Sequence, residues 1–146
     1  MDDIEIKRHS LAHVLAMAVL DLRPDTKLGI GPTIENGFYY DFDFNGPPPG
    51  IDCFEKLEKK MAELMKSDFD FERKEIDTSE AKKIFKNQPY KLELIDELTQ
   101  KNQPISIYKS GEFIDLCAGP HVDSTKDLKS VSFKLMKIAG AYWRGS

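Results

Sequence analysis

Three histidines and one cysteine fall in two short motifs that lie far apart in the chain. His9 and His13 stand four residues apart in the segment RHSLAH, whereas Cys117 and His121 enclose Ala-Gly-Pro. On a helix, residues four apart have Cβ atoms roughly 5 to 6 Å apart, so the first pair could reach one ion or one substrate group. Gly119-Pro120 predicts a turn that lets the thiol and the third imidazole converge. These four side chains are the first candidates for chemistry.

Three imidazoles and a thiolate form a suitable ligand set for tetrahedral zinc. Four ligands would close the coordination sphere and make the ion structural, whereas three would leave a zinc-bound water with a pKa of about 7 as a hydrolytic nucleophile. Without a metal, the imidazoles could position a water directly. A simpler explanation is that the histidines only pack in a core and that the cysteine acts as a small buried hydrophobic residue. The residues alone leave these alternatives open.

The first histidine pair is expected on a helix over residues 9–22, because apolar residues recur there at helical spacing. At about 100° per residue, the two histidines lie on the side opposite this stripe and share that side with further apolar residues. A helix that is apolar nearly all round is buried on two sides, so one face should pack on a sheet and the other should line a pocket. The helix should end before Arg23-Pro24. The stripe consists of Leu11, Val14, Leu15, Ala18, Val19 and Leu22.

A first hairpin is predicted over residues 28–44, with its turn at Asn36-Gly37, the strongest short turn signal in the chain. Its second strand alternates aromatic and acidic residues, so that Tyr40 shares one face with three phenylalanines. By itself this pattern indicates that Tyr40 is a core residue.

A second hairpin is predicted over residues 104–117, with its turn at Ser110-Gly111. This hairpin would deliver Asp115 and Cys117 to a strand end. Just before it, Lys91 falls in the first turn of a predicted helix. Without further information, Lys91 could be a solvated lysine and Asp115 a carboxylate that accepts backbone N–H bonds.

The remaining elements mix strands and helices without a regular βαβ alternation. We therefore predict an α+β fold in which a mostly antiparallel sheet is packed with helices. Capping of helices is expected at Asp52 and at Thr78 or Ser79. The expected elements are a helix that follows Asp52, a strand over 69–76, a helix through Phe85, a helix over 90–98 and a last strand over 131–143.

The composition is that of a globular protein, with 40% hydrophobic and 32% charged residues in 146. This length suits one domain over residues 1–146. Membrane association is not expected, because no apolar run approaches the roughly 20 residues of a membrane span. The acidic start lacks a signal-peptide pattern, so the expected location is the cytoplasm, with Cys53 and Cys117 as two separate thiols.

The net charge of −4 argues against a stand-alone nucleic-acid surface, because phosphate contacts need concentrated Lys and Arg. The last part of the chain is locally basic. This basic run is either a solvated face or an edge that faces phosphate. It consists of Lys126, Lys129, Lys134, Lys137 and Arg144.

Five segments together resemble the editing domain of bacterial-type threonyl-tRNA synthetase, a module shared with alanyl-tRNA synthetase and free-standing alanyl-tRNA deacylases. The segments are HSLAH, IGPTIENGFYYDFD, YKLEL, DLCAGPHV and FKLMKIAGAYWRG. They occur in the family order and cover essentially the whole chain. The GPH and GAYWRG segments resemble the threonyl branch. Ala118 stands where many relatives have arginine, which puts one RNA contact in doubt.

The resemblance implies hydrolysis of seryl-tRNA(Thr), which arises when serine is joined to the tRNA for threonine. A missing methyl group changes binding by only about 1 to 3 kcal/mol, so a synthetic site for threonine cannot fully reject serine. A second pocket shaped for serine can exclude threonine sterically.

The resemblance also implies roles for individual residues. It places Lys91 and His121 in water activation or charge stabilisation, with Cys117 beside the reacting ester. His9, His13 and Asp115 would hold the serine amine, the terminal adenosine or the water, and Tyr40 falls on the pocket tyrosine of the family. The family implies either no required metal or a Zn²⁺ ion held by the set His9, His13, Cys117 and His121.

The implied partners are the acceptor end of tRNA(Thr) carrying serine and the remainder of a threonyl-tRNA synthetase chain, of which this chain would be a fragment. No aminoacylation is expected from this chain alone, because it has no room for an ATP-binding core. Two alternatives remain: a deacylase of the alanyl type that acts in trans, and a non-catalytic RNA-binding module stabilised by zinc.

Overall fold

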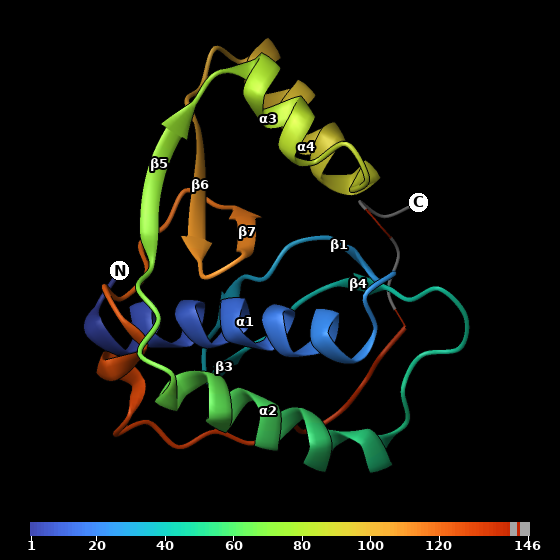
Figure 1. The fold of residues 1–146 in the computed structure, drawn as a ribbon, viewed down its shortest axis with the longest axis vertical. Coiled ribbons are helices and arrows are strands. Elements are labelled where there is room, and N and C mark those ends of the chain that lie inside the picture. Colours follow the sequence, from blue (N-terminus) through green and yellow to red (C-terminus); the bar gives the residue numbers. More distant parts are fainter. Residues whose placement is uncertain (141–142, 144–146) are drawn as a thin grey trace.

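The computed structural model describes residues 1–140 and 143, and helix α1 (Asp3–Leu22) crosses the middle of the molecule in Figure 1. The helix begins six residues earlier than predicted, because Asp2 caps it by accepting a hydrogen bond from the Glu5 N–H at 2.9 Å. Its first six residues are mostly charged and none is buried, so no apolar stripe marked them. The expected end before Pro24 is confirmed, and the helix is buried nearly all round between Ser10 and Val19.

The first predicted hairpin forms two small antiparallel pairs in the described chain. Strand β1 (Lys27–Leu28) pairs with β4 (Phe42–Asp43), and β2 (Thr33–Ile34) pairs with β3 (Gly37–Phe38). The predicted turn is wrong by one residue. Because Ile34 lies opposite Gly37, the turn residues are Glu35 and Asn36, and Gly37 already belongs to the strand.

Helix α2 (Phe54–Lys66) packs along α1 on the side away from the three-stranded sheet (Figure 1). The predicted cap at Asp52 is wrong, because this residue lies inside the short 3-10 helix η1 (Ile51–Cys53) that leads into α2. The predicted helix after Asp52 is confirmed, and its buried residues are Phe54, Leu57, Met61 and Met65.

The three-stranded antiparallel sheet has the order β5-β6-β7, formed by β5 (Glu72–Ile76), β6 (Ile105–Ser110) and β7 (Phe113–Leu116). The second hairpin turns at Gly111 and Glu112, one residue later than predicted, because Ser110 already pairs with Phe113. Gly111 has a φ of +59°, the left-handed conformation that glycine adopts at low cost.

Helices α3 (Thr78–Ile84) and α4 (Pro89–Gln100) lie together at the top of Figure 1, beyond the end of the sheet. The cap of α3 is Asp77, whose side chain accepts a hydrogen bond from Glu80 N–H at 2.8 Å, and not Thr78 or Ser79 as predicted. The 3-10 helix η2 (Thr125–Leu128) packs against α2 and carries Leu128 into the core.

The last predicted strand is wrong over residues 131–140, which form no regular element, and residues 141 and 142 lie outside the described chain. Apolar residues of this segment are nevertheless packed inward. Val131, Phe133 and Leu135 pack on the core formed around α1, and the N–H of Leu135 donates to the Glu58 carboxylate at 3.4 Å. The segment is therefore held by apolar contacts and a side chain of α2, and not by a neighbouring strand.

The α+β fold class is confirmed, and the buried apolar residues form two separate clusters. The larger cluster is built around α1, α2 and the small strand pairs, and also takes in Tyr40. The smaller cluster joins α3 and α4 to the three-stranded sheet. No helix among the described residues is long and apolar enough to cross a membrane.

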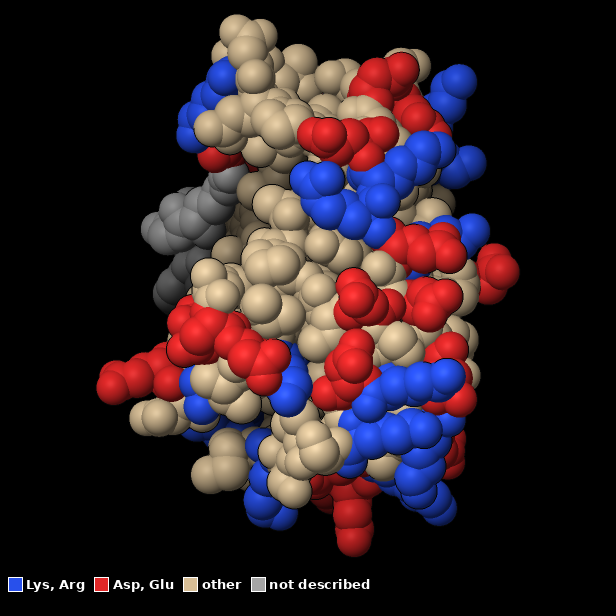
Figure 2. Space-filling model, turned by 90° about the vertical axis from the view of Figure 1, so that its left-hand side faces the viewer, with Lys and Arg blue, Asp and Glu red and all other residues tan. Residues whose placement is uncertain are grey.

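Strand β5 has a free edge, because the sheet order places it outermost. Its residues Glu72, Arg73, Lys74 and Glu75 are all exposed, and charged side chains on an edge strand discourage pairing with another chain. On the face drawn in Figure 2, which is the β5 side of Figure 1, Lys and Arg side chains are interspersed with Asp and Glu side chains. This face therefore presents a mixed charge pattern.

Candidate active site

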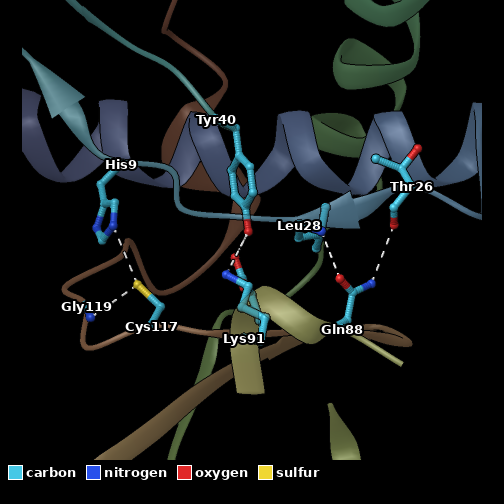
Figure 3. A network of polar contacts seen from close by, with 9 residues as sticks. His9, Thr26, Leu28, Tyr40, Gln88, Lys91, Cys117 and Gly119 are labelled. Carbon is cyan, nitrogen blue, oxygen red and sulfur yellow. Dashed lines mark hydrogen bonds and ion pairs between the residues drawn. The ribbon is translucent and has the colours of Figure 1, made fainter. Parts of the chain in front are cut away.

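A buried lysine joins the two clusters (Figure 3). Lys91 in the first turn of α4 places its Nζ 2.8 Å from Oδ1 of Asp115 on β7 and donates to the Tyr40 hydroxyl at 3.1 Å. The Tyr40 hydroxyl in turn donates to Oδ2 of Asp115 at 2.8 Å. Lys91 is only 1% exposed and Asp115 only 5%, so the alternative of a solvated lysine is wrong.

The environment of Tyr40 keeps its phenol protonated. Burial, and next the negative charge of Asp115, raise the pKa of Tyr40 well above its usual value. The hydroxyl can therefore donate to Asp115 while it accepts from Lys91. An ammonium group has three hydrogens. One is donated to Tyr40, and the charge is paired with Oδ1 of Asp115 without a hydrogen bond of regular geometry, so a third hydrogen is left for a ligand in the pocket that Lys91 lines.

Helix α4 is positioned by Gln88, the residue that precedes its first turn. The Gln88 side chain accepts from the Leu28 N–H at 2.8 Å and donates to the Thr26 carbonyl at 3.5 Å (Figure 3). These two bonds attach the start of α4 to β1, in the other cluster. Because Lys91 follows three residues later, the same bonds fix where its side chain enters the site.

The second group of predicted residues meets beside the lysine. His9 Nε2 lies 3.5 Å from Sγ of Cys117, and the His9 and His121 rings are stacked with centroids 4.3 Å apart. The Gly119 N–H donates to the Cys117 sulfur at 3.3 Å, as Figure 3 shows. The predicted convergence of thiol and imidazoles is thus found in the structure. Burial raises the pKa of Cys117 to about 11, so the sulfur is a thiol at neutral pH.

Three of the four proposed metal ligands lie close together, and His13 is the exception. Ligand atoms of His9, Cys117 and His121 lie within 4.8 Å of one another, a set of two imidazoles and a thiol that suits zinc with one open position. His13 is not a member of this group, and its Nε2 faces the Ser110 hydroxyl at 3.1 Å. A closed site with four ligands therefore does not match the geometry.

His13 is packed as a core residue although it touches the pocket. It is 2% exposed, and its ring lies 4.9 Å from that of Phe71 and 4.8 Å from that of Phe113. Burial lowers the pKa of His13 to about 4, so it is neutral at neutral pH. Its Nδ1 has no hydrogen-bond partner among the described residues.

All seven predicted site residues line one pocket of about 200 Å³. The chain also contributes wall residues that sequence reasoning missed, which are Ile30, Gly31, Pro32 and Leu116. Among them, Gly31 carried a signal in the segment IGPT, because glycine often marks a close approach of another group. A Cβ at Gly31 would overlap the Tyr40 ring, so the absence of a side chain makes room for the pocket tyrosine.

The two thiols, Cys53 and Cys117, are both free, as predicted. Four lysines of the predicted basic run, Lys126, Lys129, Lys134 and Lys137, are exposed, and Lys129 pairs with Asp68 at 3.5 Å. The fifth member, Arg144, lies outside the described residues.

Comparison with known proteins shows that the chain is similar to a part of threonine–tRNA ligases. Residues 105–145 match the family described as threonyl and alanyl tRNA synthetase second additional domain. A threonine–tRNA ligase of Dehalococcoides mccartyi strain CBDB1 is 52% identical over 145 residues, which cover 99% of this chain and 24% of the relative. Threonine–tRNA ligases of Thermotoga petrophila and Borrelia garinii subsp. bavariensis are each 51% identical, over 97% and 96% of this chain and 22% and 24% of the relatives. The chain thus spans about a quarter of the length of these relatives.

Removal of the buried Lys91 ammonium should destabilise the folded chain. We expect Lys91→Met to lower the free energy of unfolding by about 3 to 5 kcal/mol, because it leaves the Asp115 carboxylate buried without its cation. The double variant Lys91→Met with Asp115→Asn should regain part of this loss. Urea unfolding measures both. The control is Lys82→Met, because the Lys82–Asp96 pair is more than half exposed and should contribute less than about 1 kcal/mol. Equal losses in the two single variants would contradict a dominant buried pair.

A methyl group at Gly31 should disturb the tyrosine. We expect Gly31→Ala to cost about 1 to 3 kcal/mol in thermal unfolding, because the new Cβ would press on a buried aromatic ring. Gly37→Ala is the matched control, because its Cβ would meet only Ile34, at 3.9 Å. A Gly31→Ala variant as stable as the control would show that the ring can move aside.

Proposed function

Because the chain belongs to the family of threonyl and alanyl tRNA synthetase second additional domains, we propose that it hydrolyses the ester of seryl-tRNA(Thr). It would act as one editing domain over residues 1–146, with serine and tRNA(Thr) as products. The observation that carries the proposal is the buried Lys91, which lines a small pocket together with the histidines and the thiol.

The size of the pocket supports an aminoacyl group as the part of the substrate that enters. A volume of about 200 Å³ lies below the roughly 300 to 1,000 Å³ of pockets for drug-sized ligands. A serine residue is small enough for such a site, while the terminal nucleotide would remain at the mouth. The Tyr40 ring lies tightly against Gly31, so this side of the pocket can move little. A rigid pocket wall favours steric exclusion of the larger threonine.

The chemistry is the addition of water to the ester carbonyl carbon, followed by cleavage of the bond between that carbon and the ribose oxygen. Lys91 would donate its third hydrogen to the oxyanion, an interaction for which single donors are worth about 10² to 10³ in rate. Burial lowers the pKa of His121 to about 2, which keeps the free ring neutral but weakens it as a base. His121 would accept the proton of the attacking water as negative charge develops on the ester beside it. That proton would then pass to the departing ribose oxygen.

A zinc ion held by His9, Cys117 and His121 would supply a Lewis acid at the same place. Its binding would require loss of the Cys117 thiol proton, and Lys91 already supplies a positive charge at the pocket without a metal. We propose that hydrolysis proceeds without a metal.

The proposed partners are the acceptor end of tRNA(Thr) and the remainder of a threonyl-tRNA synthetase. The chain carries a net charge of −4, which gives it little general attraction for RNA. In a longer chain, neighbouring domains would supply tRNA affinity through effective concentration. Aminoacylation is assigned to those other domains.

The test is release of labelled serine from seryl-tRNA(Thr), with threonyl-tRNA(Thr) as the second substrate and a chelator in parallel reactions. We expect rapid release of serine, slow release of threonine and no effect of the chelator. His121→Ala should lower the rate by at least about 10²-fold, because a proton acceptor contributes that much or more. The exposed Lys82→Ala variant is the control and should keep the full rate.

Other outcomes identify the alternatives. Faster hydrolysis of seryl-tRNA(Ala) than of seryl-tRNA(Thr) would indicate a deacylase of the alanyl type. No hydrolysis of any ester, together with a melting temperature that falls on chelation, would indicate a non-catalytic module stabilised by zinc.

A further inference from the structure

A buried serine between the two helix histidines has no role in the function proposed above. Ser10 is 0% exposed, and its hydroxyl touches three polar groups. Oγ lies 2.8 Å from the Ile6 carbonyl oxygen, 3.0 Å from the Val122 nitrogen and 3.2 Å from Nδ1 of His121. It therefore connects α1 to the segment that carries His121.

The three neighbours of Ser10 determine the direction of each hydrogen bond. A hydroxyl has one hydrogen to donate and two lone pairs to accept with. The Ile6 carbonyl can only accept, so it receives the hydroxyl hydrogen, and the Val122 N–H can only donate. In the contact with His121, the Ser10 oxygen must then again be the acceptor, and Nδ1–H of the ring is the donor.

The protonation state of the His121 ring determines whether its other nitrogen, Nε2, carries a hydrogen or a lone pair. The His121 ring is packed among the rings of His9, His13, Phe71 and Tyr108, which offer no negative charge to stabilise an imidazolium. The ring is therefore neutral and carries a single N–H. A hydrogen on Nδ1 leaves a lone pair on Nε2, for which the described residues provide no hydrogen-bond donor.

We propose that Ser10 is a positioning residue that holds His121 as the Nδ1–H tautomer, so that Nε2 serves the pocket as an acceptor. The opposite tautomer would place a lone pair of Nδ1 against Ser10. The hydroxyl would then have to turn its hydrogen away from Ile6, which gives up the shortest of its three contacts.

His9 cannot take the place of His121 as this acceptor. Its Nδ1 faces the Pro120 carbonyl oxygen at 3.0 Å, and a carbonyl only accepts, so Nδ1 of His9 also carries a hydrogen. Its Nε2 faces the Cys117 sulfur at 3.5 Å, where the thiol hydrogen can be donated to it. Of these two stacked rings, His121 therefore has the free acceptor nitrogen.

The tautomer of His121 does not depend on the proposed function. Only its consequence for hydrolysis rests on that function. An acceptor at Nε2 can take a proton from the attacking water, whereas an N–H at this position cannot. The tautomer itself is a property of the folded chain and can be measured without any substrate.

The experiment is a long-range ¹H–¹⁵N correlation spectrum of chain labelled in histidine, at neutral pH and with a chelator present. The chain has only three histidines, so single His9→Ala and His13→Ala variants assign the signals. We expect His121 to show a protonated Nδ1 and an unprotonated Nε2. An unprotonated Nδ1 in the unaltered chain would overturn the proposal, even if Ser10 variants failed to fold.

The Ser10→Ala variant tests the role of the serine. We expect the His121 signals to move toward the other tautomer, and kcat for serine release to fall by about 10-fold or more with a smaller change in KM. Ser110→Ala is the matched control, because this buried serine faces His13 and should change the His13 signals alone. His121 signals that stay unchanged in Ser10→Ala would overturn the role of Ser10. A changed tautomer in a chain that hydrolyses no ester would leave the positioning role intact and reject the proposed function.

Discussion

The buried pair of Lys91 and Asp115 is the interaction on which the arrangement of the site depends. The lysine comes from the helix that packs in the smaller apolar cluster, and the tyrosine that accepts from it belongs to the larger one. Neither charge could be left alone in this interior, because an unpaired buried charge costs several kcal/mol. The hydrogen bonds of Tyr40 to both members of the pair therefore join the two clusters. It also leaves a cation at the pocket in surroundings where water screens it poorly.

The contact between the two apolar clusters depends on hydrogen bonds as well as on apolar packing. The Gln88 amide binds the backbone of β1, and the Tyr40 hydroxyl binds both members of the ion pair. Hydrogen bonds of this kind tolerate little change in distance or angle. The pocket walls are consequently fixed before a ligand arrives, which is the condition under which dipoles and charges contribute most to a reaction.

The elements with strong local periodicity were predictable, whereas contacts between distant segments were not. The stripe of α1 and the alternation in the hairpins gave helix, strands and fold class, but both turns were displaced by one residue because the register depends on pairing. The burial of Lys91 could not be read locally, since its partners Asp115 and Tyr40 lie 24 and 51 residues away. The spacing of His9 and His13 suggested a common ligand, yet His13 Nε2 faces Ser110 and His13 does not join the group formed by His9, Cys117 and His121.

The three histidines show how environment, and not residue type, sets the use of a side chain. His13 is enclosed by two phenylalanines, His9 is engaged by a carbonyl and a thiol, and His121 keeps one nitrogen for the pocket. That nitrogen can serve only one purpose at a time. If the His121 lone pair binds a metal, it can no longer accept a proton from water, and the metal must activate the water instead. In the proposed reaction, metal-bound and metal-free hydrolysis would therefore be exclusive uses of the same atom.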